Sequence, residues 1–273
     1  MKQINQFINE YIIKKKLDNP IDSEDHYKYF PENKLELSKI IKDLLKDNQT
    51  DLNIIDVSKI TDMSELFDKI NQSIEINDID ISKWDVSNVT NMKYMFFGCS
   101  KFNCDLSDWN VSNVEDMIGM FQNCKNFTGK GLEKWNVSNV KNMFSTFDYC
   151  TSFTGKGLEK WDVSNIVNMS GMFQGCRNLD CDLSKWNISK VKNMQSMFYE
   201  CINFTGKGLE NWNISNVKSM VYMFYGCYNF NCDNVKNWKV NDSCNISAMF
   251  NKCTDKPDWY EEKINSKRLK YTL

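Results

Sequence analysis

The chain has 273 residues, of which 41% are hydrophobic and 26% are charged, and its formal net charge is -2 at pH 7. These are ordinary values for a globular protein that buries a sizeable core. Because displacing counterions from phosphates needs a clear basic excess, the charge excludes a general nucleic-acid binder. The sequence has no run of about 18 apolar residues, so it predicts no insertion into a membrane.

Residues 1–50 are predicted to form an N-terminal helical cap with a further helix appended to it. An amphipathic segment within residues 1–20 either packs on the cap or docks on a partner. The lysines at the start follow the apolar residues, an order that is not typical of a signal peptide. The apolar face of the cap helix lies at Leu37, Ile40, Ile41, Leu44 and Leu45.

Residues 51–253 consist of a repeated unit, exemplified by WDVSNVTNMKYMFFGC at residues 84–99. Its tryptophans recur every 25 or 26 residues, a period that indicates a stack of coils. The short connector between units reads FNCDLSDW, whereas the long one, FTGKGLEKW, has two glycines that we expect to turn with positive φ. The tryptophans predicted to lie in the core are Trp84, Trp109, Trp135, Trp161, Trp186 and Trp212.

Each unit combines two hydrophobic rhythms. In residues 84–89 apolar and polar residues alternate, which suits a short strand with one buried face. In residues 92–99 the apolar positions are i, i+3, i+4 and i+7, the spacing of one face of a short helix. The sequence therefore predicts an α/β repeat solenoid, a right-handed stack of about eight strand-helix coils with helical caps at both ends.

Residues 254–273 are predicted to form the C-terminal helical cap. An uncovered last coil would expose both its core and its strand edge, so the stack needs such a cover. Asp258 is placed to cap the start of this helix, and Trp259 is placed to plug the core.

The repeats DLSDWNVSNVEDMIGMF and DLSKWNISKVKNMQSMF, at residues 105–121 and 182–198, carry the pattern W-D-V-S-N-V-T-N-M-x-x-M-F-x-G-C. With this pattern the chain resembles, over roughly residues 50–253, the bacterial surface-protein repeat family of about 26 residues, related to BspA-like leucine-rich repeat proteins. The resemblance implies a leucine-rich-repeat-like stack. It also implies a role as a surface adhesin or as an interaction protein that binds other proteins.

Eleven cysteines raise three alternatives: reduced core residues, disulfides or a metal site. No C-x-x-C pair exists and an odd number cannot pair completely, which favours reduced cysteines and a reducing compartment. Three of them, Cys104, Cys181 and Cys232, occupy short connectors, and Cys244 stands apart. The remainder share one inward position of the repeat, where a cysteine acts as a small buried hydrophobe: Cys99, Cys124, Cys150, Cys176, Cys201, Cys227 and Cys253.

Two columns of Asp and Asn residues, exemplified by Asp85 and Asn88, recur in nearly every unit. Stacked side chains of this kind satisfy backbone groups in turns, so we interpret both columns as hydrogen-bonded ladders. A calcium site is the alternative, but it needs convergent carboxylates, and most of these residues are Asn.

The sequence offers no catalytic residue. His26 is the only histidine and lies outside the repeats, where a surface or cap role is expected. TGKG recurs at residues 128, 154 and 205, but it is expected to lead back into a strand, whereas a phosphate loop needs a strand before it and a helix after it. We therefore expect no enzyme, no bound metal and no cofactor.

The outward positions of the predicted helices vary between repeats and are rich in aromatic residues. Tyrosine on a solvent-facing surface is typical of protein interfaces, because it offers a large contact area with few rotatable bonds. The alternative is that scattered aromatic residues merely cover the stack. The candidate binding residues are Tyr94, Phe97, Phe144, Tyr149, Tyr199, Tyr222, Tyr225 and Tyr228.

The sequence thus predicts a non-catalytic protein-binding stack, adhesin-like or an interaction scaffold, that binds through an aromatic-rich helical face. The alternative is an intracellular effector or a toxin-neutralising, immunity-type binding protein. The absent signal peptide and the cysteine usage favour the cytoplasm, whereas the family resemblance implies the cell surface or secretion. The partner is expected to be another protein.

Overall fold

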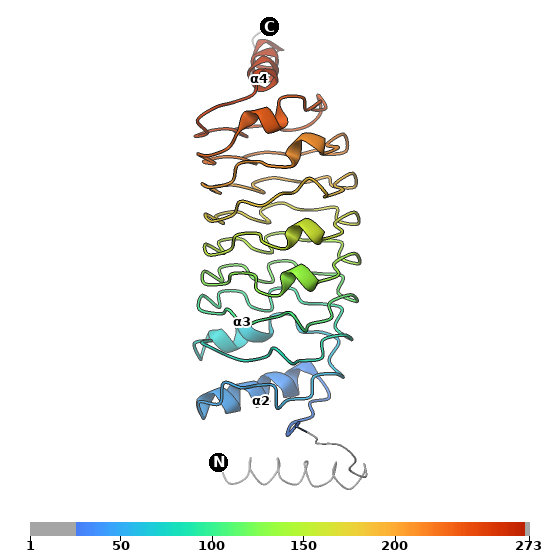
Figure 1. Ribbon diagram of the computed structural model, residues 1–273, viewed down its shortest axis with the longest axis vertical. Helices are drawn as coiled ribbons and strands as arrows, with labels where there is room; N and C mark the ends of the chain where they lie inside the picture. Colours follow the sequence, from blue (N-terminus) through green and yellow to red (C-terminus); the bar gives the residue numbers. More distant parts are fainter. Residues whose placement is uncertain (1–25, 271–273) are drawn as a thin grey trace.

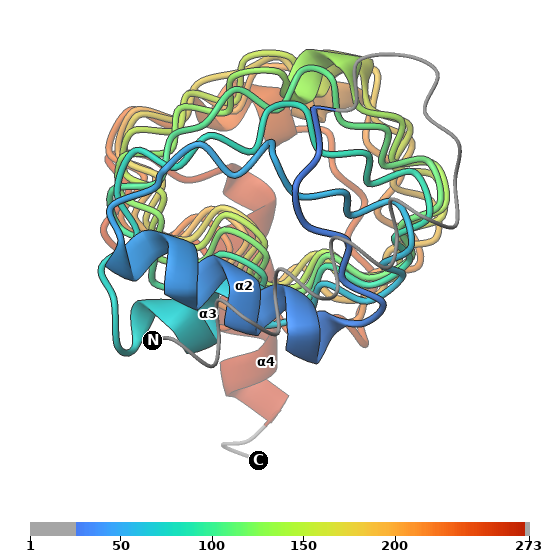
Figure 2. The same ribbon diagram turned by 90° about the horizontal axis from the view of Figure 1, so that it is seen from below.

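The computed structural model describes residues 26–270. The chain winds into coils that stack along one axis, with α2 (Lys34–Lys46) at one end and α4 (Asp258–Lys270) at the other (Figure 1). Seen along that axis, successive coils overlie one another (Figure 2). A residue therefore lies beside its counterparts in the neighbouring repeats. The segment 1–20, for which a docked helix was predicted, lies outside the described residues.

The coils are joined by backbone hydrogen bonds, but not through strands. Successive coils meet at isolated parallel bridges, such as that of Asn91 with Asp116, and within residues 26–270 these bridges never extend into a strand. The predicted α/β solenoid of strand-helix coils is therefore wrong. In residues 84–89 the Asp85 carboxylate accepts a hydrogen bond from the Ser87 amide at 3.0 Å, which bends the backbone into a turn.

The second half of each unit, predicted as a short helix, is a run of tight turns. In residues 92–99 the amide of Met95 donates to the Met92 carbonyl, three residues back, at 3.2 Å. The amide of Tyr94 instead donates to Ile118 in the next coil at 2.8 Å. An α-helix directs its amides to the fourth residue back, so this segment is not one. The turn segments are residues 92–99, 117–124, 143–150, 169–176, 194–201, 220–227 and 246–253.

Two residues of every turn segment have a left-handed backbone, which an α-helix excludes. In the first segment they are Tyr94, with φ 52°, and Gly98, with φ 73°. The recurring glycine of the F-x-G-C pattern was the signal of this conformation in the sequence. The equivalent residues are Gly119 and Asn123, Ser145 and Tyr149, Gly171 and Gly175, Ser196 and Glu200, Tyr222 and Gly226, and Ala248 and Lys252.

Regular helix is limited to a few places in the described chain. The earliest coil has a true α-helix, α3 (Leu66–Asn71), where later coils have turn segments. Gly131 has φ 95°, as expected for the long connector, and a Cβ there would lie 2.2 Å from the Ser107 amide nitrogen. The short 3-10 helices are η1 (Leu132–Lys134), η2 (Leu158–Lys160), η3 (Leu209–Asn211) and η4 (Cys232–Val235).

All eight tryptophans make the same hydrogen bond. Each indole Nε1–H donates to a main-chain carbonyl one repeat earlier at 2.8–3.1 Å, as Trp135 does to Leu106. Trp259, in α4, donates to Val235 and so continues the ladder beyond the last coil. The predicted core tryptophans are buried, with exposures of 2–5%: Trp84, Trp109, Trp135, Trp161, Trp186 and Trp212.

The cysteine column is buried except at Cys253, which is partly exposed, and it also forms a ladder. The Cys176 thiol donates to the Phe147 carbonyl in the preceding coil at 2.9 Å. Burial raises the pKa of the Cys176 thiol well above its usual range, so the proton that makes this bond is retained. The predicted core cysteines are fully buried: Cys99, Cys124, Cys150, Cys176, Cys201 and Cys227.

Of the two Asp and Asn columns, that of Asn88 forms a ladder between coils, as predicted, whereas that of Asp85 bonds within its own coil. The Asn113 side chain donates to the Ser87 carbonyl in the preceding coil at 2.7 Å. The Asn110 side chain accepts from the Ser112 amide at 3.1 Å. These side chains therefore satisfy backbone groups of the turns, which is the structural role expected of them.

The first end of the described stack is covered by α2. Its Lys34 ammonium donates to the Asp62 carboxylate at 2.7 Å and to the Ser64 carbonyl at 3.2 Å, which ties the helix to the earliest coil. At the other end Trp259 lies edge-on to Phe250, with ring centroids 6.1 Å apart. Tyr260 is buried beside the same ring.

Candidate protein-binding face

The outward side of the turn segments carries the aromatic residues predicted to bind a partner. Exposure is 52% at Tyr228, 42% at Tyr222, 39% at Phe144 and 36% at Tyr149. The other four are half-buried: Tyr94, Phe97, Tyr199 and Tyr225. None of the eight is part of a helix, so the predicted helical face is in fact a surface of stacked turns.

Three of these residues contact one another and form the tyrosine cluster: Tyr199, Tyr222 and Tyr225. The rings of Tyr199 and Tyr225, at equivalent positions of consecutive coils, stack with centroids 4.7 Å apart and planes within 2°. Tyr222 lies edge-on to both, with centroids 6.4 Å from Tyr199 and 5.8 Å from Tyr225. Such contacts hold the rings in fixed positions, which lowers the entropy lost when a partner binds them.

A lysine of the last turn segment extends the cluster. The Lys252 ammonium lies 5.0 Å from the centroid of the Tyr225 ring, within the range of a cation–π contact. A hydrogen bond with the Tyr225 hydroxyl raises the pKa of Lys252, and Tyr228 is close enough to contribute. Sequence reasoning missed Lys252, because a solvent-facing lysine carries no signal without the neighbouring coil.

Tyr149 carries the surface toward the middle of the stack. Its ring lies over Gly175 in the next coil, where a Cβ would come 2.7 Å from the ring. Burial raises the pKa of Tyr199, and the nearby Glu200, Tyr225 and Tyr149 raise it further. The aromatic surface therefore spans several consecutive coils.

Tyr94 and Phe97 form a separate pair nearer the first end. Their rings meet edge-on at 5.8 Å, and Lys93 lies 5.5 Å from the Tyr94 ring centroid. The Tyr94 ring covers Gly119, where a Cβ would come 2.2 Å from it. The structure thus does not bring this pair into the tyrosine cluster, although the sequence grouped them.

The turn segments around the tyrosine cluster carry little charge. Residues 143–150, 169–176, 194–201 and 220–227 contain only two charged side chains, Asp148 and Glu200. Depletion of charge together with enrichment in tyrosine is the composition of the centre of a protein interface.

Asp148 is an unusual carboxylate on this side of the stack. It is only 5% exposed, and its Oδ2 accepts a hydrogen bond from Gln122 at 2.6 Å in the preceding coil. Its Oδ1 is buried and has no hydrogen-bond partner in the described chain. Burial raises the pKa of Asp148 to about 6. The signal in the sequence was a carboxylate at a position where both neighbouring coils have Gln.

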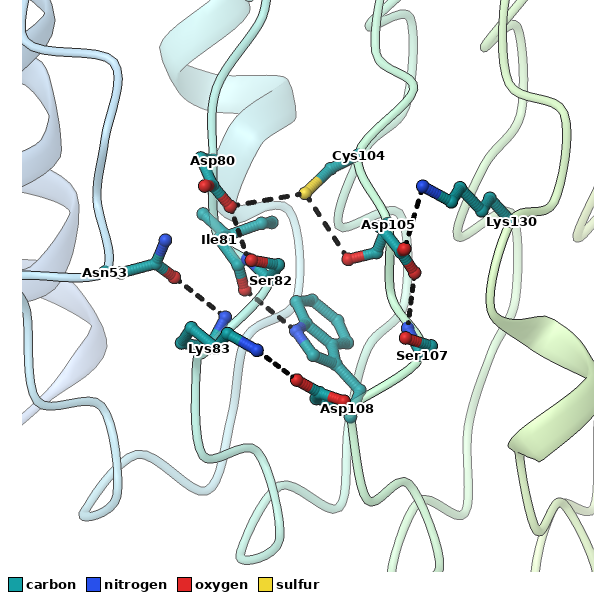
Figure 3. A network of polar contacts seen from close by, with 11 residues as sticks. Asn53, Asp80, Ile81, Ser82, Lys83, Cys104, Asp105, Ser107, Asp108 and Lys130 are labelled. Carbon is teal, nitrogen blue, oxygen red and sulfur yellow. Dashed lines mark hydrogen bonds and ion pairs between the residues drawn. The ribbon is translucent and has the colours of Figure 1, made fainter.

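The surface formed by the connectors differs from the tyrosine cluster, because it carries ion pairs. Figure 3 shows the Lys130 ammonium on the Asp105 carboxylate, at 2.9 Å, and the ion pair of Lys83 with Asp108. The hydrogen bond from Lys130 lowers the pKa of Asp105. These pairs connect one coil to the next.

A surface hollow of about 410 Å³ lies beside these pairs and is lined by Asp78, Asp80, Cys104 and Asp105, among others. Asp80 and Asp105 each accept from the amide two residues later, at 2.9 and 3.0 Å, so both carboxylates serve to shape turns (Figure 3). Burial raises the pKa of Cys104, which makes it a poor nucleophile. In residues 26–270 no group of three or more His, Cys, Asp or Glu residues is arranged to hold a metal ion.

One protein family matches this chain. The model of the family described as "Mycoplasma protein of unknown function, DUF285" matches residues 35–157 and again residues 144–262. The chain belongs to this family. The double match reflects the repeats, since each half of the stack fits the same family model. No curated protein and no solved structure matches the chain.

DUF285 membership names no activity, so any function has to be argued from the surface of the stack. His26 is exposed, apart from the turn segments. None of the helices described is long and apolar enough to cross a lipid bilayer.

Proposed function

We propose that the protein is a non-catalytic binding protein that holds another protein on the tyrosine cluster and the surrounding turn segments. The observation that carries the proposal is the packed arrangement of Tyr199, Tyr222 and Tyr225 on the outward side of consecutive turn segments. Tyrosine is one of the residue types that contribute most of the binding energy in protein interfaces.

Two settings for this binding are open. The resemblance of the repeats to BspA-like proteins supports an adhesin-like role or an interaction scaffold. The ladder of thiols, exemplified by the Cys176 bond to Phe147, supports a protein that works in a reducing compartment, such as an effector or a toxin-neutralising partner. Both settings use the same face.

The test is capture of partners from the source cells and from candidate target cells, identified by mass spectrometry. The bait carries Tyr199→Ala, Tyr222→Ala and Tyr225→Ala together. Alanine fits the left-handed backbone of Tyr222, because Ala248 holds the equivalent position with φ 53°. Circular dichroism and thermal melting establish that the variant remains folded.

The matched control carries Lys83→Ala, Lys130→Ala and Lys207→Ala, which remove three exposed cations from the connector side. A partner that binds the wild type and this control, but not the tyrosine variant, supports the proposal. A partner that binds all three proteins equally would contradict it.

A further inference from the structure

The last turn segment, residues 246–253, differs from those before it in where its amides point. In residues 220–227 four alternate amides donate to carbonyls of the next coil. These bonds are Met220 to Asn245 at 2.8 Å, Tyr222 to Ser247 at 3.1 Å, Phe224 to Met249 at 2.9 Å and Gly226 to Asn251 at 2.9 Å. The same scheme holds from the segment of residues 92–99 onward.

In the part of the chain that the structure describes, no further coil follows the segment 246–253 to accept these bonds. The amides of Ile246, Ala248 and Lys252 have no acceptor among residues 26–270. At Phe250 the hydroxyl of Tyr260 in α4 lies within reach of the backbone of both Phe250 and Met249, and the two rings pack with centroids 5.1 Å apart. α4 therefore takes the place of a next coil over the core only at this position.

This edge offers donors alone. The carbonyls of Ser247, Met249 and Asn251 already accept bonds from the preceding coil. Two copies of the protein therefore cannot pair through this end, because donors would face donors. The acceptor edge at the other end of the stack is covered by α2, where Lys34 occupies the Ser64 carbonyl, so head-to-tail pairing is also blocked.

Most of the edge is reachable from solvent. Ser247, Asn251 and Lys252 are exposed and Ala248 is partly exposed, whereas Ile246 is buried. Figure 2 shows α4 crossing the end of the stack and running out beyond one side, so it does not close the whole coil. Unpaired backbone donors in a regular row are a template on which another chain adds itself.

We propose that this end binds a segment of another polypeptide that supplies main-chain carbonyls at alternate residues, in the register of one more coil. The mode is edge augmentation, in which the backbone gives affinity and side-chain contacts give selectivity. The complementary partner is a chain with free acceptors, and a segment of this same repeat type offers them. The site adjoins the tyrosine cluster through Lys252, but it binds through backbone amides and does not depend on the function of the tyrosine side chains.

The probe is a synthetic peptide of residues 116–126, DMIGMFQNCKN, kept under reducing conditions. In the stack its Asp116, Ile118, Met120 and Gln122 carbonyls accept from the preceding coil. Amide hydrogen exchange of the full chain is measured with site resolution, with and without the peptide at about 1 mM, and a scrambled peptide is the control. The amides of Met220, Tyr222 and Gly226 provide the internal reference.

In the free protein we expect the amides of Ala248 and Lys252, which lie on the reachable part of the edge, to exchange at least about 100-fold faster than the reference amides. The peptide should slow them about tenfold or more, whereas the scrambled peptide should not. The tyrosine triple variant should respond as the wild type does. Equal protection in the free protein, no slowing by the peptide, or a response lost with the tyrosines would each overturn the proposal.

Discussion

The tyrosine cluster and the connector side differ in how their surface groups are used. On the connector side charged residues meet across coils, as Lys130 meets Asp105 and Lys207 meets Asp182 at 3.2 Å. The charges of these pairs therefore have partners within the stack. In the tyrosine cluster the rings support one another, but Tyr222 remains 42% exposed. The same stack thus has one side with paired charges and another side with exposed aromatic surface, whose burial by a partner would be favourable.

Both sides of the stack depend on the buried core between the coils. Substitutions in this core should therefore have the largest effect on the free energy of unfolding. Trp135→Ala removes a buried ring and its bond to the Leu106 carbonyl, so we expect a loss of about 3–5 kcal/mol in the free energy of unfolding. Trp135→Phe keeps most of the ring and should cost clearly less. Urea unfolding followed by circular dichroism measures both, and equal stability of wild type and Trp135→Ala would contradict the role of the ladder.

Replacing Asp148, the buried carboxylate of the turn segment 143–150, should have the next largest effect on stability. The pKa of Asp148 is about 6 in the folded protein and near 4 in the unfolded chain. The folded state therefore binds the proton more tightly, and stability falls as pH rises from about 4 to 6. Asp148→Asn should remove this loss and stabilise the protein by up to about 3 kcal/mol at pH 8, with little effect near pH 3.

Thermal unfolding of wild type and Asp148→Asn from pH 3 to 8 measures this difference. Glu200→Gln is the control, since it removes the other charge of these turn segments at a half-buried position. A difference between wild type and Asp148→Asn that does not change with pH would show that the carboxylate ionises freely in the folded protein.

Replacement by alanine should reduce stability more at a cysteine of the buried column than at a cysteine of a connector. Cys176→Ala removes a fully buried thiol and its bond to Phe147, which should cost about 1–2 kcal/mol of stability. Cys104→Ala, in a connector, changes a partly exposed thiol whose nearest acceptor is 3.5 Å away and should cost less than about 0.5 kcal/mol. Guanidinium unfolding under reducing conditions compares the two, and an equal cost would mean that the thiol ladder contributes nothing beyond packing.

The connector ion pairs should have the smallest effect. A double-mutant cycle on Lys130 and Asp105 is expected to give a coupling of about 0.5 kcal/mol that falls as salt is raised, because Lys130 is exposed and Asp105 is partly exposed. A coupling above about 2 kcal/mol that resists 1 M salt would mean that the connector side stabilises the stack as much as the core does.

The repeated sequence allowed the stacking of the coils and their buried positions to be predicted. Tryptophans at a fixed spacing and cysteines in one column identified the buried positions, because stacked coils place equivalent residues against one another. The ladder of the Asn88 column followed from the same logic. The sequence also identified the individual tyrosines on the outward side. It did not indicate that Lys252 and Asp148 belong to the same surface, because their contacts are made with neighbouring coils.

The sequence by itself determined the period, the core columns and the Asp and Asn columns, since each depends on identical residues recurring at identical positions. Tertiary structure decided the backbone. The apolar spacing of residues 92–99 fits an α-helix and a run of turns equally well, and the helix satisfies its own amides. In the stack every second amide bonds to the next coil, so the turns also join the coils. Such bonds exist only once the neighbouring coil is in place, and the same rule leaves the last coil with open donors.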